Sequence, residues 1–140
     1  MSRKLFVSLP VVDVARSRTF FDALGFEFNP KFTGGNAACM IINDGIQVML
    51  VARDFYQTLT PKPMGDPMTA SNALLALWLD TRNEVDALHG IALANGATNG
   101  GDTDDYGFMY QRGFNDPDGH QWALSWIDET QIPPQEPSGA

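Results

Sequence analysis

The segment Asn115–Leu124, NDPDGHQWAL, decides how the rest of the chain is interpreted. Its Asp-Pro-Asp-Gly portion predicts a tight turn, because Pro117 fixes φ and Gly119 can adopt the left-handed conformation. A strand is predicted to follow. A weaker copy of the segment, NDGIQVML, spans Asn43–Leu50. When Gly45 is aligned with Gly119, the strands also align, pairing Gln47 with Gln121, Val48 with Trp122, Met49 with Ala123 and Leu50 with Leu124.

The repeat extends upstream of both turns. SLPVVD ends at Asp13 and LALWLD ends at Asp80, and a helix-like pattern follows each of them up to a glycine, Gly25 or Gly96. Strand, helix, turn and strand therefore recur in the same order, which indicates a duplicated module. We predict an α+β fold of two βαβββ modules.

The predicted elements follow from local signals. Strands are expected at 4–11, 26–29, 36–43 and 46–52 in the first module, residues 4–52. Asp13 and Thr81 are candidate helix N-caps, and Thr81 forms a T-x-x-E capping box with Glu84. In the second module, residues 73–128, strands are expected at 73–80, 97–98, 107–114 and 120–127. The apolar run at 73–80, ALLALWLD, predicts a strand buried on both faces.

Two segments lie outside the modules. Residues 53–72 form a connector in which Pro61, Pro63, Gly65 and Pro67 predict irregular structure after a short helix at 53–59. A loop this long is often a lid or an arm that contacts a partner, and a plain linker is the alternative. Residues 129–140 are predicted to be a mobile tail, so that one domain occupies residues 1–128.

Composition limits the possible functions. The chain of 140 residues has 44% hydrophobic residues, enough for a folded interior, and its net charge of -8 argues against nucleic-acid binding. No apolar run approaches the ~20 residues of a membrane helix, and the N-terminal run is too short for a signal peptide. The single cysteine, Cys39, excludes an intrachain disulfide. We therefore expect a cytoplasmic protein with no nucleic-acid or membrane partner.

Three segments carry a family resemblance: LPVVDVARSRTFFDALGFEFN, CMIINDGIQVML and GFMYQRGFNDPDGHQWALSWID. They resemble the glyoxalase / bleomycin-resistance / extradiol-dioxygenase superfamily, also called vicinal oxygen chelate proteins, and within it the branch of predicted lactoylglutathione lyases. The resemblance covers about residues 4–128. It implies that the paired modules form a curved, mixed sheet of eight strands around a cavity, usually in a homodimer.

The resemblance also implies where metal ligands would lie. Carried over residue by residue, the four ligand positions are occupied by Phe6, Met49, Leu74 and Ala123. None has an oxygen or nitrogen donor, and a thioether is a poor ligand for the metals that these enzymes use. We therefore predict no metal and no cofactor.

The same strand faces predict an apolar cavity wall with a few polar groups, which suits a small organic ligand. A cavity filled by its own side chains is the alternative. The residues predicted to bind a ligand are Phe6, Ser8, Gln47, Met49, Leu74, Trp78, Tyr106, Tyr110, Gln121 and Ala123. Catalytic residues cannot be assigned.

Other polar residues have more than one interpretation. His120 follows the turn, where its ring is expected to bond nearby backbone rather than to act in catalysis. Cys39 is expected to be a core residue. Tyr106, Phe108 and Tyr110 lie near Asp102, Asp104 and Asp105 in the sequence, and such a cluster either binds a cation or is a solvated acidic loop.

Three functions follow as hypotheses. The first is a metal-free protein that sequesters a small molecule, as bleomycin-resistance proteins do. The second is a glyoxalase-like lyase with a displaced metal site or with metal-free acid–base chemistry. The third is a structural homodimer whose cavity is vestigial.

Overall fold

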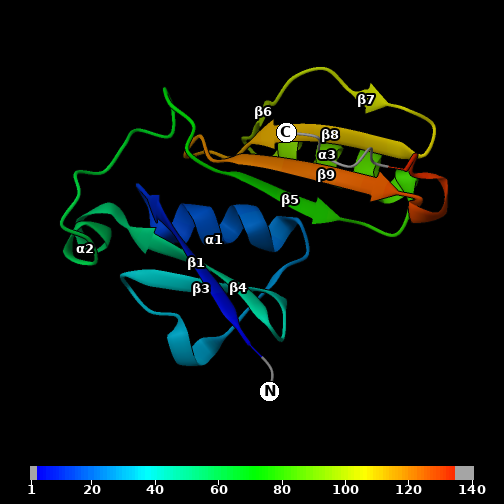
Figure 1. Ribbon diagram of the computed structural model, residues 1–140. Helices are drawn as coiled ribbons and strands as arrows, with labels where there is room; N and C mark the ends of the chain where they lie inside the picture. Colours follow the sequence, from blue (N-terminus) through cyan, green and yellow to red (C-terminus); the bar gives the residue numbers. More distant parts are fainter. Residues whose placement is uncertain (1–2, 135–140) are drawn as a thin grey trace.

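The computed structural model describes residues 3–134 and contains two βαβββ modules joined by a connector (Figure 1). Module 1 holds β1 (Leu5–Val11), α1 (Val14–Ala23), β2 (Glu27–Phe28), the 3-10 helix η1 (Pro30–Phe32), β3 (Ala37–Asn43) and β4 (Ile46–Ala52). The connector begins with α2 (Arg53–Thr58). Module 2 holds β5 (Leu74–Trp78), α3 (Arg82–Ala94), β6 (Thr98–Asn99), β7 (Asp104–Asp105), β8 (Met109–Asn115) and β9 (Gln121–Ile127), and η2 (Glu129–Gln131) follows.

Both predicted helix N-caps are confirmed. The Asp13 carboxylate accepts a hydrogen bond from the backbone N–H of Arg16 at 3.1 Å. The Thr81 hydroxyl accepts one from the backbone N–H of Glu84, also at 3.1 Å. These side chains satisfy N–H groups that have no partner within the helix, which is why caps can be located from sequence alone.

The predicted eight-stranded sheet is wrong for the described residues. Module 1 forms a four-stranded sheet in the order β1-β4-β3-β2. Module 2 forms a five-stranded sheet in the order β5-β9-β8-β6, with β7 also paired to β8. The first strand of each module pairs in parallel with the last, so the modules share one topology. β1 and β5 do not pair with each other, and β7 falls in a stretch predicted to be a loop.

The turn between β8 and β9 occupies part of the edge of β1. The imidazole Nε2–H of His120 donates to the carbonyl oxygen of Pro10 at 2.7 Å. The buried Asp118 carboxylate accepts three hydrogen bonds from module 1, donated by Val12 N at 2.8 Å, Arg16 Nη2 at 3.1 Å and Ser17 Oγ at 3.0 Å. Side chains of module 2 thus satisfy backbone groups of module 1 that a neighbouring strand would otherwise satisfy.

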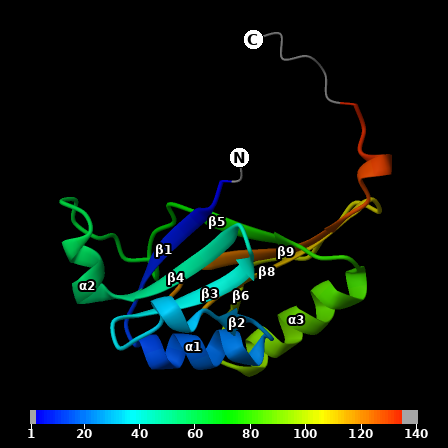
Figure 2. The same cartoon turned by 90° about the horizontal axis from the view of Figure 1, so that it is seen from below.

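One apolar core joins the modules. Figure 2 shows α1 and α3 next to each other on one side of the two sheets. Phe20 and Phe21 of α1 pack against Phe114 and Trp122 of module 2, with ring centroids 5.9 Å and 5.2 Å apart, respectively. We call the side of each sheet that faces away from α1 and α3 its inner face. The two inner faces differ in how much of them is covered.

In module 1 the inner face is covered in part, with Phe6 and Phe32 still exposed at its rim. The ring of Phe32 in η1 meets the ring of Phe6 edge-on, with the centroids 6.2 Å apart. Cys39, Gln47 and Val51 are buried on this face. The stretch from β2 to β3 therefore covers the face that would otherwise be exposed.

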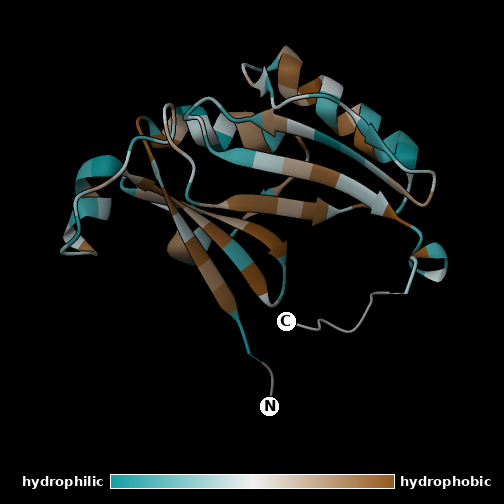
Figure 3. Cartoon of the chain, turned by 45° about the horizontal axis from the view of Figure 1, so that its top comes forward, coloured by the Kyte–Doolittle hydropathy of each residue, from teal (hydrophilic) through white to brown (hydrophobic). Residues whose placement is uncertain are grey.

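In module 2 the inner face is open along β5. Leu74 is 74% exposed and Trp78 is 60% exposed, whereas Leu75 and Leu77 pack against the core. The prediction that this strand is buried on both faces is therefore wrong, because α3 covers only one of them. Figure 3 shows the apolar colour of β5 at the edge of its sheet.

The C-terminal segment is described in part. The 3-10 helix η2 lies where the mobile tail is predicted to begin, and the Asp128 side chain accepts a hydrogen bond from the backbone N–H of Thr130 at 3.1 Å. Residues 135–140 lie outside the described residues, so the predicted mobility there stays a prediction.

Candidate functional site

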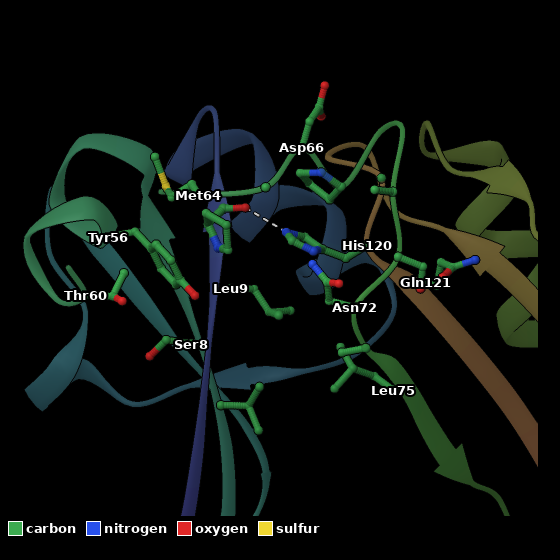
Figure 4. A pocket seen from close by; sticks show the side chains of 18 of the residues that line it. Ser8, Leu9, Tyr56, Thr60, Met64, Asp66, Asn72, Leu75, His120 and Gln121 are labelled. Atoms are coloured by element: carbon green, nitrogen blue, oxygen red, sulfur yellow. Dashed lines mark hydrogen bonds between the residues drawn. The ribbon is translucent and has the colours of Figure 1, made fainter. Parts of the chain in front are cut away.

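A cavity of about 370 Å³ lies between β1 and the connector (Figure 4). Residues 7–10 of β1 and residues 119–121 at the start of β9 form part of its wall. The connector supplies Tyr56 and Thr60 near one end and most of the segment from Lys62 to Ala73. The volume lies within the range of cavities that bind small organic molecules.

Hydrogen bonds within the connector give this wall its shape. The amide Nε2 of Gln57 donates to the carbonyl oxygens of Thr60 and Lys62, at 3.2 Å and 2.8 Å. The Gln57 Oε1 accepts a hydrogen bond from the backbone N–H of Met64 at 3.3 Å. One glutamine side chain therefore folds the proline-containing stretch back on α2.

The far end of the connector rests on the turn before β9. Gly119 has φ +92°, and a Cβ atom there would lie 2.7 Å from the carbonyl oxygen of Pro67 and 2.8 Å from the backbone nitrogen of Met68. Only glycine permits both this φ and this close approach. The turn that organises the sequence thus also positions the cavity wall.

Several polar side chains of the cavity have no side-chain hydrogen bond within residues 3–134. These are the hydroxyl groups of Ser8 and Tyr56 and the amide of Asn72. They lie among the apolar side chains of Leu9, Met64 and Leu75 (Figure 4). A mostly apolar wall with a few available polar groups is typical of a site for a small organic ligand.

His120 and Gln121 both line this cavity, and their side chains point in different directions (Figure 4). A carbonyl oxygen can only accept, so the His120 Nε2 carries the proton that is donated to Pro10. The Oε1 of Gln121 is buried and has no hydrogen-bond partner among the described residues. Buried polar atoms in native proteins usually have a partner, so this oxygen is an exception that needs a reason.

The structure brings only some of the predicted ligand-binding residues together. Ser8 and Gln121 line the cavity. Gln47 and Met49 lie on the covered inner face of module 1, where Phe6 contacts Phe32. Leu74, Trp78 and Ala123 lie on the open inner face of module 2, outside the cavity lining.

Tyr106 and Tyr110 lie elsewhere. Tyr106 is exposed in the loop before β8. Tyr110 lies on the α3 side of its sheet, where its hydroxyl donates to Asp86 at 2.5 Å, which lowers the pKa of that carboxyl. A cation does lie in this aromatic and acidic cluster, but it is Arg82 of the same chain. Its guanidinium is 4.4 Å from the centre of the Tyr110 ring and pairs with Asp105, which holds the pKa of that carboxyl below its usual value.

Sequence reasoning missed the contributions of Tyr56, Asn72 and the ring of His120. The connector was predicted to be a possible lid or arm, but neither Tyr56 nor Asn72 belongs to the repeat. The expectation that His120 binds backbone is confirmed, but the carbonyl belongs to β1, at the other end of the sequence. A contact between such distant residues leaves no local pattern in the sequence.

A second cavity of about 410 Å³ lies on the other side of the connector segment and shares Gln121 and Gly119 with the first. Asp116 lies against it, buried, with its Oδ2 accepting from the indole Nε1 of Trp122 at 3.1 Å. Burial raises the pKa of the Asp116 carboxyl. The other Asp116 oxygen accepts from two backbone N–H groups of its own turn, which indicates a structural role.

Comparison with known proteins agrees with this geometry. Residues 3–43 match the family model described as bleomycin resistance protein-like N-terminal. A comparison with curated protein sequences found no match. The predicted resemblance to the glyoxalase / bleomycin-resistance / dioxygenase superfamily is confirmed by this match together with the fold of solved structures.

Three solved structures illustrate the likeness of fold. A hypothetical protein from S. aureus has a TM-score of 0.77 and 22% identity, and the match covers 91% of this chain and 95% of that one. A glyoxalase/bleomycin resistance protein/dioxygenase family enzyme from Burkholderia phytofirmans has a TM-score of 0.73 and 19% identity, covering 88% and 97%. A lactoylglutathione lyase from Agrobacterium tumefaciens has a TM-score of 0.64 and 16% identity, covering 90% and 94%.

The metal that the fold family implies does not fit the residues present. The positions that the resemblance implies for metal ligands are Phe6, Met49, Leu74 and Ala123, whose side chains offer no oxygen or nitrogen donor. None of the four lines either cavity. Within residues 3–134, no three His, Cys, Asp or Glu side chains are grouped as metal ligands would be. A separate point concerns membranes. Within residues 3–134 no helix is long and apolar enough to span one.

Proposed function

We propose that this chain binds a small organic molecule in the cavity between β1 and the connector and sequesters it. The observation that carries the proposal is the cavity itself, a space of about 370 Å³ with an apolar wall and several polar groups that have no internal partner. The likeness in fold to bleomycin-resistance proteins supports sequestration as the role.

The charge of the chain favours a neutral or cationic ligand. The net charge of -8 attracts cations and repels anions at long range. Lys62 and Asp66, the charged residues of the lining, are both exposed, and the rest of the lining is uncharged apart from the titratable His120. A cationic ligand should therefore bind more weakly as salt is added, because salt screens the long-range attraction.

A screen of metabolites and antibiotics by thermal shift tests this proposal. Ser8→Trp places a large side chain in the cavity and should abolish the stabilisation produced by any hit. Ala76→Trp is the matched control, because Ala76 occupies the equivalent place on β5 and is exposed outside the cavity. Hits that stabilise both variants equally, or the absence of any hit, would contradict the proposal.

Metal-free acid–base chemistry is the second candidate function. It rests on His120, whose ring is oriented by the bond to Pro10 and whose Nδ1 is available at the cavity. A base held in this way can remove a proton from a bound molecule. Conversion of a bound compound that stops with His120→Gln, while binding persists, would favour this function over sequestration. A lactoylglutathione-lyase-like reaction would be one form of it.

We also propose that the chain forms a homodimer. The support is the exposed inner face of module 2, where Leu74 and Trp78 lie beside the free edge of β5. A row of apolar side chains beside an unpaired strand edge favours association with a second copy.

A further inference from the structure

We infer that the ligand of this cavity is uncharged and presents an oxygen atom, as a ketone, an ester or an alcohol does, to the hydroxyl groups of Ser8 and Tyr56. This inference rests on the proposed binding function and names the ligand class that the site would select.

One end of the cavity carries three hydroxyl groups. Ser8 comes from β1, Tyr56 from α2 and Thr60 from the residues just after α2. Figure 4 shows these three side chains together at the end of the cavity that lies away from β9. Among the described residues, no hydrogen bond joins one of these hydroxyls to another. They are therefore available to a bound molecule rather than to each other.

A ligand can reach the hydroxyl groups of Ser8 and Tyr56. Both residues are half-buried, and neither hydroxyl has a hydrogen-bond partner in the described part of the chain. In that part of the chain, Oε1 of Gln121 is the only side-chain oxygen or nitrogen that is fully enclosed without a partner. The oxygens of Ser8 and Tyr56 therefore keep surface that is open to the cavity, where a ligand can replace solvent.

The hydroxyl groups are held in place before a ligand arrives. Ser8 lies within the sheet, where it pairs with Met49 of β4. The carbonyl oxygen of Thr60 accepts a hydrogen bond from Nε2 of Gln57 at 3.2 Å, and its Oγ1 accepts one from the backbone N–H of Lys62, also at 3.2 Å. Because Oγ1 is already an acceptor, the Thr60 hydroxyl still has its proton to donate. Donors that are fixed in advance lose less entropy when a ligand binds.

The fold itself does not require a hydroxyl at the position of Ser8. Ser8 lies opposite Met49, and Ala76 lies opposite Ala123, so Ala76 is the counterpart of Ser8 in module 2. The same strand is formed there without a hydroxyl group. The Ser8 hydroxyl is thus a feature of the cavity rather than of the βαβββ topology.

The charges around the cavity favour an uncharged oxygen over an ammonium or a carboxylate group. The carboxylate of Asp66 in the cavity lining is exposed, points away from the cavity in Figure 4 and accepts from the backbone N–H of Met68 at 2.9 Å. An ammonium group would therefore enter without a carboxylate to pair with. A carboxylate ligand would be repelled at long range by the net charge of -8. A neutral oxygen accepts from hydroxyl groups and avoids both costs.

Four probes that share a phenyl ring and two further carbons test the chemistry. Acetophenone presents a neutral oxygen, ethylbenzene has no polar atom, 1-phenylethylamine is a cation at neutral pH and phenylacetate is an anion. Binding to the full chain is followed by NMR titration, with the amide signals of Ser8, Tyr56 and Thr60 as reporters. We expect acetophenone to bind at these residues and the other three to bind about tenfold more weakly. Ethylbenzene should be weaker because the hydroxyls would lose solvent without gaining a partner.

Two substitutions connect the selectivity to the hydroxyl groups. Tyr56→Phe and Ser8→Ala each remove one hydroxyl and should weaken acetophenone by about three- to tenfold. Neither should weaken ethylbenzene, which makes no hydrogen bond, so a loss caused by distortion of the cavity is distinguishable from a lost hydrogen bond. Tyr106→Phe is the matched control, because Tyr106 is exposed outside the cavity and its change should leave both affinities the same.

The outcomes separate this inference from the proposed function. If ethylbenzene or either charged probe binds as tightly as acetophenone, or if both substitutions leave acetophenone unchanged, the inference is overturned while binding in the cavity stands. If only compounds from the metabolite screen bind, the same two substitutions are applied to them, and affinities that do not fall overturn the inference. If neither the probes nor any screened compound binds, the proposed function fails and the inference fails with it.

Discussion

Gln47 in module 1 and Gln121 in module 2 are equivalent by repeat and by strand register, yet their surroundings differ. Gln47 is buried beneath the stretch that contains η1 and accepts a hydrogen bond from Cys39. In module 2 the counterpart of Cys39 is Gly113, which has no side chain, and Gln121 lines a cavity with its buried Oε1 unpartnered among the described residues. The two modules share one βαβββ topology, so the side chains and the covering loops decide which of the two glutamines lies at a cavity.

The turns before these glutamines differ in the same way. Asp118 is buried and bonded to the start of α1, whereas its counterpart Asp44 is exposed. Only the turn before β9 therefore reaches the other module, and the equivalent turn before β4 does not. The turn before β9 brings His120 to β1 and leaves the inner face of β5 open.

The largest expected difference between two equivalent positions comes from removing the Asp118 carboxylate, which contacts module 1. Asp118→Ala should reduce the free energy of unfolding by about 2–3 kcal/mol, because the buried Ser17 hydroxyl and the Val12 N–H lose their acceptor. Asp44→Ala, the equivalent change in module 1, should alter it by less than about 0.5 kcal/mol. Urea denaturation of both variants measures the difference. Equal losses would mean that the two turns are energetically alike.

The contact between the connector and Gly119 gives the next largest effect. Gly119→Ala should destabilise by about 1–3 kcal/mol more than Gly25→Ala, because only the former pushes a Cβ atom against the Pro67 backbone. Gly25 is a fair control, since it has the same φ of +92° with nothing within 4 Å. Thermal denaturation and ligand titration should show lower stability and weaker binding for Gly119→Ala. Similar values for both variants would show that the close approach is not a constraint.

Substitutions on the open inner face of module 2 should change stability less. Trp78→Ala should change the free energy of unfolding of a single chain by less than about 0.5 kcal/mol, because the ring is exposed. Leu50→Ala in the closed core of module 1 should cost about 2–5 kcal/mol.

Combining Leu74→Asp with Trp78→Asp should convert the proposed dimer to a monomer, as measured by light scattering. A native chain that is already monomeric at micromolar concentration would contradict the dimer.

The smallest effect concerns pH and a contact that exists only in module 2. The pKa values of Asp86 and Asp105 are lowered in the folded state, chiefly by the Tyr110 hydroxyl for Asp86 and by Arg82 for Asp105. Their contribution to stability is present above the ordinary carboxyl pKa and is lost as pH falls through the lowered values.

Arg82→Met should therefore lower the melting temperature slightly at neutral pH and not at all in strong acid. Arg18→Met is the control, since Arg18 stacks on the ring of Phe28 without a carboxylate partner in residues 3–134. Its effect should not depend on pH in this range. A loss that persists unchanged in acid for Arg82→Met would assign the contact to ring stacking alone.

Much of the fold was predictable from local and repeating signals. Caps at Asp13 and Thr81, the stops at Gly25 and Gly96 and the alternation in β9 each act within a few residues. Because the two modules repeat, a strand, helix or turn predicted in one module also predicted its counterpart in the other. Gln121 and Ser8 could be placed at a cavity because strand alternation fixes which side chains share a face.

The sequence by itself thus determined the two βαβββ modules and the caps and turns that delimit them. Only the tertiary structure decided that the sheets remain separate, that β5 exposes Leu74 and Trp78, and that the connector and His120 close a cavity against β1. The physical reason is the distance along the sequence over which each interaction acts. Local geometry is encoded in neighbouring residues, whereas the loop that covers one face and the turn that meets a distant strand depend on how the finished modules pack.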